Sequence, residues 1–343
     1  MYGVKGAPFR YKGAVNVEDC KSSIEVMEKA GLDWEVAKCE LVAKMPGLTK
    51  DGLREDGFFH GGDYFTQCPN AFATYRTDCN IPLGIVKERY TIVQNTEAFS
   101  FFDNAIGKDK SIWQTAGFFG NGERIFVSAK LPDNILVNGD PVENYLVFTT
   151  SHDGSSGVKI LFTPIRIICQ NTLNAAIKQA SNYISIRHTY SVHKNIDIAH
   201  EILGICQQQT KYLSEQFNAM DKIKLTDSQV HKLFADVVLT EDEKLQLAYT
   251  GHTVDQLVNK HWSAIDDSGI SMKKVNVLNE MAHYYHLGPG QQDIIGTAWG
   301  AYGAITGYYS NIDNSTGIKR MDTLLFGDKS RKIEKAGNLL LAA

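Results

Sequence analysis

The residues best suited to binding chemistry form a basic and aromatic series in the middle of the chain. Residues 154–196 contain no Asp or Glu but five Lys or Arg residues. The rest of the chain carries 30 basic and 39 acidic residues, in a protein whose net charge is −4. Cations that follow phosphates, together with rings on which bases stack, are what binding to single-stranded nucleic acid requires. The candidate binding residues are Arg124, Phe126, Lys130, Lys159, Arg166, Arg187, His188, Tyr190 and Lys194.

Within this series the side chains have different expected roles. The expected phosphate contacts are Lys159, Arg166, Arg187 and Lys194, and the expected stacking rings are Phe126 and Tyr190. An ordinary mixed-charge surface is the competing interpretation, because Lys and Arg are exposed in most soluble proteins. The run of 43 residues without an acid favours the nucleic-acid interpretation.

Two catalytic motifs can be weighed in the same region. Ser151, His152 and Asp153 are consecutive, and neighbours on a strand point to opposite faces, so they cannot form a nucleophile-to-base relay. The glycine-rich residues 154–157 lack the Gly-Lys-Ser/Thr ending of a nucleotide-binding loop. One alternative function is a metal-dependent hydrolase or nuclease that uses His152, Asp153 and His188. Another is a non-catalytic protein that binds a host factor.

Composition limits the setting and the cofactors. Six cysteines are scattered without a Cys-x-x-Cys pair, which predicts reduced thiols in a cytoplasm. No cofactor and no metal are expected. Residues 294–312 carry no charge, yet four glycines and three tyrosines make them too polar for a confident membrane span. We therefore expect a soluble helix whose glycines let a neighbouring element approach closely.

The candidate binding residues belong to a predicted antiparallel meander of about four strands over residues 111–169. In residues 124–131 the apolar Ile125, Val127 and Ala129 alternate with Arg124 and Phe126, so one face should enter the core. A tight turn at 153–154 joins the last two strands, and a helix should follow residue 170. That helix would cover one face of the sheet and leave the other face available for binding.

Local sequence signals in the first hundred residues predict two helices, three strands and a loop. Asn16 is a candidate N-cap for a helix that ends at Gly31, and Asn95 is a candidate N-cap for a helix that ends at Gly107. Strands are predicted at 34–44, 71–78 and 85–93, with a glycine-rich loop at 46–63.

After residue 195 the pattern is helical. Thr226 with Gln229 and Thr240 with Glu243 are capping boxes, which mark helix starts. Further helices are expected at 253–265 and 272–286, in the glycine-rich stretch, and from residue 331. The predicted fold class is α+β, with an α+β domain at 1–194 and a helical region at 195–343; the two could also form one continuous domain.

Five motifs resemble the phage/plasmid-like protein family, which carries a domain of unknown function (number 932). Taken together they span most of the chain. They are RYTIVQN (89–95), TSHDGS (150–155), TPIRIICQNTLN (163–174), IRHT (186–189) and LFGD (325–328). The resemblance implies a phage or mobile-element origin and a bacterial cytoplasmic setting, but no activity.

The expected function combines these observations. A meander followed by a helix, with a basic face, is similar in outline to the core of single-strand annealing recombinases, an analogy at the level of fold. We therefore expect a phage or plasmid replication or recombination protein. It would bind single-stranded DNA and could anneal strands without ATP. It would act as a homo-oligomer, in a ring or filament, rather than as an enzyme.

Overall fold

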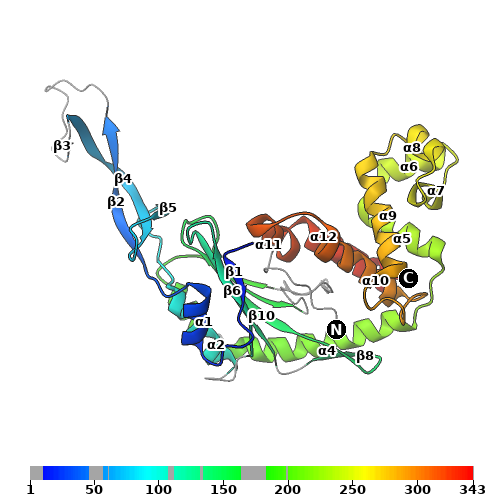
Figure 1. Cartoon of the computed structure of the whole chain (residues 1–343), viewed down its shortest axis with the longest axis horizontal. Coiled ribbons are helices and arrows are strands. Elements are labelled where there is room, and N and C mark those ends of the chain that lie inside the picture. Colours follow the sequence, from blue (N-terminus) through cyan, green and yellow to red (C-terminus); the bar gives the residue numbers. More distant parts are fainter. Residues whose placement is uncertain are drawn as a thin grey trace.

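The computed structural model describes residues 11–45, 57–60, 62–106, 112–131, 134–163, 183–197 and 200–342. The molecule is elongated, with a central sheet, a β-ribbon that projects from one end, and a group of helices at the other end (Figure 1). The structure contains antiparallel sheets as well as a helical C-terminal region, so the predicted α+β class is confirmed.

The central sheet is antiparallel throughout. Its strands, in spatial order, are β1 (Ala14–Asn16), β6 (Ile112–Phe119), β7 (Arg124–Lys130), β10 (Tyr145–Ser151), β11 (Val158–Thr163) and β12 (Tyr183–Ile186). The middle four are the predicted meander. The connection between β10 and β11 is longer than the tight turn predicted at 153–154, because it spans residues 152–157; Gly154 lies within it at φ +77°. A small hairpin, β8 (Ile135–Val137) with β9 (Asp140–Val142), is inserted after β7.

Both faces of the central sheet are buried. On one face Ile125, Val127 and Ala129 pack under α1 (Ser23–Ala30) and α2 (Asn95–Ile106), as their alternation predicts. On the other face Phe126 packs with Met321 and Leu325 of α11 (Gly317–Leu325). The expectation that this second face is available for binding is wrong, because a helix from the far end of the chain returns to cover it (Figure 1). The helix predicted after residue 170 lies outside the described residues.

The β-ribbon, called the arm below, is a separate antiparallel sheet. It contains β2 (Val36–Met45), β3 (Phe58–His60), β4 (Asp63–Arg76) and β5 (Pro82–Val86). Its base is tied to the body, because the Gln94 side chain donates to Val36 O and accepts from Val36 N, both at 2.9 Å. Arg76 also lies over the Trp34 ring, 4.4 Å from its centroid. The predicted strand at 85–93 is shifted: β5 ends at Val86, and residues 87–94 form a loop.

Two helix starts near the N-terminus differ from expectation. Asn16 belongs to β1, and α1 begins later, with Ser22 as the N-cap that accepts from Glu25 N. Gly31 ends this helix at φ +61°, as predicted. Asn95 starts α2, but its side chain turns into the core instead of capping.

The helical region follows the predicted periodicity except at 253–265, where the single predicted helix is interrupted at Lys260 (φ +56°) and forms two helices. It begins with α3 (Val192–Asp197) and α4 (His200–Lys222), and both predicted capping boxes form. The remaining helices are α5 (Asp227–Val238), α6 (Glu241–Tyr249), α7 (Val254–Val258), α8 (Trp262–Ser268), α9 (Met272–Leu287), α10 (Ala298–Gly307), η3 (Tyr308–Ile312), α11 and α12 (Asp328–Leu341). Helix α11 was not predicted from the sequence. Among the described residues, no helix combines the length and apolar character needed to cross a bilayer.

The glycines of α10 allow close approach within this chain's own core. A Cβ added at Gly300 would meet Ile294 O at 2.3 Å, and one at Gly307 would meet the Tyr284 ring at 2.2 Å. The glycine stripe therefore seats α10 against α9 and the loop that follows α9.

Gly300→Ala should lower the free energy of unfolding by about 1–3 kcal/mol, because its methyl group meets a backbone oxygen that cannot rotate away. Gly337 of α12 offers a matched control. A Cβ there would lie 3.5 Å from Tyr302, an ordinary contact, so Gly337→Ala should be neutral or stabilising by up to ~1 kcal/mol. Urea unfolding of both variants measures the difference, and equal effects would contradict this account of the stripe.

Candidate nucleic-acid interface

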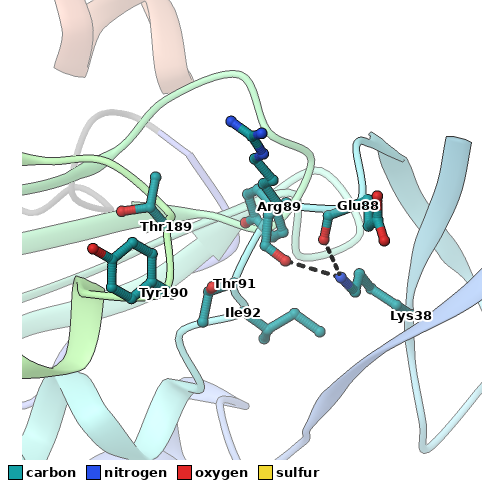
Figure 2. A pocket seen from close by; sticks show the side chains of 8 residues that line it. Lys38, Glu88, Arg89, Thr91, Ile92, Thr189 and Tyr190 are labelled. Atoms are coloured by element: carbon teal, nitrogen blue, oxygen red, sulfur yellow. Dashed lines mark hydrogen bonds between the residues drawn. The ribbon is translucent and has the colours of Figure 1, made fainter. Parts of the chain in front are cut away.

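A cavity of about 680 Å³ lies where the arm meets the body. Its lining combines β2 of the arm, the loop 87–92 and the segment between β12 and α3. Figure 2 shows Thr189 and Tyr190 on one side and Lys38 with Glu88 on the other. The volume falls within the roughly 300–1,000 Å³ typical of ligand pockets. The lining residues are Lys38, Glu88, Arg89, Tyr90, Thr91, Ile92, Thr189 and Tyr190.

Two segments of the body line the cavity, the loop 87–92 and the residues that follow β12, and His188 joins them. Thr91 N donates to His188 O at 3.2 Å, and His188 Nδ1 lies 2.9 Å from Thr91 O. A carbonyl only accepts, so Nδ1 carries the proton and Nε2 accepts from the Thr150 hydroxyl at 3.1 Å. The Tyr90 ring stacks on His188 with centroids 4.6 Å apart, and its hydroxyl donates to Ser151 O at 2.6 Å. Burial lowers the pKa of His188, so the ring is neutral and holds Thr91 and Thr150 together through its hydrogen bonds.

A second buried hydrogen-bond network, around Asn95 and His152, lies near His188. Asn95 Nδ2 donates to Leu32 O and Trp34 O at 3.0 and 3.1 Å, which leaves its Oδ1 to accept from His152 Nε2 at 2.9 Å. The His152 backbone carbonyl accepts from Thr74 of the arm at 2.6 Å. Burial, and then the nearby His188, lower the pKa of His152 to about 3. The network thus connects α2, the β10–β11 turn and the arm.

The cavity walls carry cations that carboxylates do not neutralise. Lys38 Nζ donates to two backbone carbonyls rather than to a carboxylate, with Glu88 O at 3.1 Å and Tyr90 O at 3.0 Å (Figure 2). Within the described part of the chain, Arg89 of the lining forms no ion pair and is exposed. Arg187 and Lys194 are exposed in the neighbouring segment but do not line the cavity. Acids nearby include Glu88, which also lines the cavity, Glu97, which is 2.5 Å from His193 Nδ1, and Asp153, whose charge acts on Tyr90.

Tyr190 is the ring best placed to contact a ligand. It is 93% exposed and lines the cavity beside Thr189. Its exposure contrasts with Tyr90 in the same wall, whose burial raises its pKa and whose hydroxyl is already used. An aromatic face left in water next to cations is suited to stacking on a base.

The structure separates the eight candidate residues that it describes into two groups. Tyr190 lines the cavity, whereas Arg187, His188 and Lys194 belong to the same stretch of chain without lining it; His188 is buried and positions the wall. Lys38 and Arg89 line the cavity with Tyr190, and neither was among the candidates. The RYTIVQN motif, which contains Arg89, was the signal that could have indicated this loop.

The second group, on the sheet, is used internally. Phe126 is fully buried, so its expected role as a stacking ring is wrong in this conformation. Arg124 is buried and paired with Asp322 of α11 at 2.5 Å. Lys130 pairs with Glu143 at 2.7 Å, and Lys159 lies over the Phe326 ring, 4.3 Å from its centroid. Arg166 lies outside the described residues.

The alternative metal site gains no support from the geometry. Both ring nitrogens of His188 and Nε2 of His152 are engaged in the hydrogen bonds above. Across the residues that the structure describes, no three His, Cys, Asp or Glu side chains converge as a metal site needs.

A second cavity, of about 370 Å³, lies between α5, α6 and α7. Most of its charged groups are already paired: Lys244 with Asp236 at 2.7 Å, His252 with Asp267 at 2.8 Å, and Asp255 with His231 at 2.6 Å. These pairs make it a weaker candidate than the cavity at the arm base.

A model of one protein family, described as a domain of unknown function (DUF932), matches residues 82–338. The chain belongs to the DUF932 family. The domain of unknown function predicted from the five motifs is therefore confirmed, while the family's description names neither an activity nor a phage or plasmid origin. The DUF932 region contains the loop 87–92 and Tyr190, but it begins at β5 and so leaves out Lys38 and most of the arm. No curated protein and no solved structure matches the chain.

Proposed function

We propose that this DUF932 protein binds single-stranded DNA at the cavity where the arm meets the body. The observation that carries the proposal is the 93% exposed Tyr190 ring in a wall that also presents unneutralised cations. Bases stack on the ring in any sequence, while phosphates lie against Lys38 and Arg89 of the cavity lining. Binding of this kind requires no nucleotide cofactor.

The biological setting is part of the same proposal. Resemblance of the motifs to a phage/plasmid-like family supports a role in replication or recombination of mobile DNA in a bacterial cytoplasm. Strand annealing would follow if two strands were held with their bases accessible. The cavity is open enough for this role, because its ring and cations are at the surface rather than enclosed.

Tyr190→Ala should weaken binding to a labelled oligothymidylate by about 1–3 kcal/mol, which is roughly 5–150-fold in affinity, because the stacking face is lost. Tyr190→Phe should bind like the unmodified protein, since stacking needs the ring and not the hydroxyl. Fluorescence anisotropy measures both. Tyr212→Ala, at an exposed tyrosine of α4, is the matched control and should leave affinity unchanged.

The contribution of the cations to DNA affinity can be measured separately, from the salt dependence of the same titrations. For single strands, the slope of log affinity against log salt is about −0.7 per phosphate contact. Lys38→Ala with Arg89→Ala should therefore make the slope shallower by about 1.4, whereas Tyr190→Ala should leave the slope unchanged. Lys273→Ala, an exposed cation of α9, controls for net charge. Absence of binding at low salt, or full binding by Tyr190→Ala, would refute the proposal.

A further inference from the structure

The second cavity, of about 370 Å³ between α5, α6 and α7, has a lining in which opposite charges balance. We call it the helical cavity; it shares no lining residue with the cavity at the arm base. The remaining titratable residue of the lining, His252, pairs with Asp267 at 2.8 Å. Leu247 and Val254 belong to the apolar part of the lining. The charged part consists of two lysines and two aspartates, Lys232, Lys244, Asp236 and Asp255.

Helix α5 contributes a row of polar side chains to the helical cavity. Ser228, Lys232 and Asp236 are four residues apart, which places them one above another on the helix surface. Asp236 does not pair with Lys232; its Oδ1 accepts instead from Lys244 of α6 at 2.7 Å. Lys232 is exposed, and within the described residues it forms no ion pair and no hydrogen bond. One cation of the lining is therefore left to meet an anion.

The two aspartates of the lining are each fixed through one oxygen. His231 Nδ1 donates to Asp255 Oδ1 at 2.6 Å, as Lys244 Nζ does to Asp236 Oδ1. In the part of the chain that the structure describes, Oδ2 of neither aspartate accepts a hydrogen bond. A carboxylate that a neighbouring residue holds in place offers its remaining oxygen to a ligand in a defined position.

The unused hydrogen-bond donors of the lining lie in the first turns of α5. Gln229 accepts through Oε1 from Thr226 in the capping box, and its Nε2 donates to no group within the residues described. The Ser228 hydroxyl is likewise without a partner there, and Lys232 is one turn further along. The positive end of the helix dipole also favours an anion at this position. Donors suited to a carboxylate therefore share one cavity with two carboxylates suited to an ammonium group.

We propose that the helical cavity binds a small zwitterion, an α-amino acid with an apolar side chain. A ligand of one sign would be repelled by half of the lining charges, whereas a zwitterion is attracted by all of them. Its carboxylate is bound by Lys232 and Gln229, and its ammonium group by Asp236 and Asp255. Side chains four residues apart on a helix have Cβ atoms about 5–6 Å apart, which suits two charges joined through one carbon. Leu247 and Val254 contact the ligand's side chain.

Calorimetric titration of the full chain with L-leucine, L-methionine and L-phenylalanine tests this proposal, with a thermal-shift assay as a second readout. At least one of the three should bind. The N-acetylated form of that amino acid lacks the ammonium charge and its amide lacks the carboxylate, so each should bind at least about tenfold more weakly. No binding of any of the three by either method at up to about 10 mM, or equal binding of a blocked form, would overturn the proposal.

Substitution of Lys232 locates the binding at the helical cavity without disturbing the fold, because this side chain is exposed and makes no bond in the described structure. Lys232→Ala should weaken binding of the amino acid by about 10–150-fold, the effect of one hydrogen bond to a charged group. Lys232→Arg keeps the charge and should retain most of the affinity. Lys273→Ala is the control for net charge, and unchanged affinity in Lys232→Ala would refute the site. Tyr190→Ala should bind the amino acid normally, since this inference does not depend on nucleic-acid binding.

Discussion

Asn95→Ala should lower the free energy of unfolding by about 3 kcal/mol or more, the largest effect expected of any single polar substitution here. The Asn95 side chain is buried and bonded to three groups, Leu32 O, Trp34 O and His152 Nε2. Alanine leaves all three without a partner, and each unsatisfied buried group costs about 1–3 kcal/mol. No nearby polar side chain in the described structure is shown to replace these bonds.

Urea unfolding monitored by circular dichroism measures this loss. Thr96→Ala is the matched control, because Thr96 is the next residue of α2 and is exposed; its effect should stay within about 0.5 kcal/mol. A loss below about 1 kcal/mol for Asn95→Ala would mean that the network is not a structural connection between α2, the β10–β11 turn and the arm.

This expectation changes how the family motifs are interpreted. RYTIVQN ends in Asn95, TSHDGS contains His152, and IRHT contains His188, and the structure brings these three segments together. Their buried side chains hold the loop 87–92 and Tyr190 in place, which is a positioning role. The apparent triad of Ser151, His152 and Asp153 belongs to this scaffold, since Ser151 Oγ donates to Ser156 O within the turn at 2.7 Å.

Local patterns in the sequence were sufficient to predict most secondary structure. The alternation of Ile125, Val127 and Ala129 identified the core face of β7, and the capping boxes at Thr226 and Thr240 identified two helix starts. These signals depend on neighbours within one element, so no knowledge of the tertiary structure is needed to use them.

The covering of the second sheet face could not be predicted in this way. Arg124 finds its partner Asp322 across 198 residues, and Phe126 is buried by Met321 of the same helix. Nothing in the strand's own sequence distinguishes a basic face in water from one covered by α11. The cavity was missed for a related reason: it is formed by a loop, an arm strand and the start of a helix, and none of these is a site by itself.

Above pH 4, His152 should make a large contribution to the pH dependence of stability, and His188, whose pKa burial also lowers, should add a contribution of the same sign. The pKa of His152 is lowered to about 3 in the folded protein, mainly because burial disfavours the imidazolium, against 6.5 for the ordinary side chain. Between these values the unfolded chain binds a proton that the folded chain does not. Stability is therefore fully present above pH 6.5 and is lost as the pH falls towards 3. At pH 4.5 this loss is on the order of 3 kcal/mol.

His152→Gln separates this contribution from the rest of the titration. Glutamine keeps an N–H that can donate to Asn95 Oδ1 but does not titrate, so the variant should lose about 3 kcal/mol less between pH 7 and pH 4.5 than the unmodified chain. Stopping at pH 4.5 stays above the ordinary pKa of 3.8 of Asp78 and Asp313, whose own pKa values lie near 2. His283→Gln, at an exposed histidine of α9, should leave the pH dependence unchanged. Parallel pH profiles for the unmodified chain and His152→Gln would show that the folded protein accepts this proton, and that the network around Asn95 opens in mild acid.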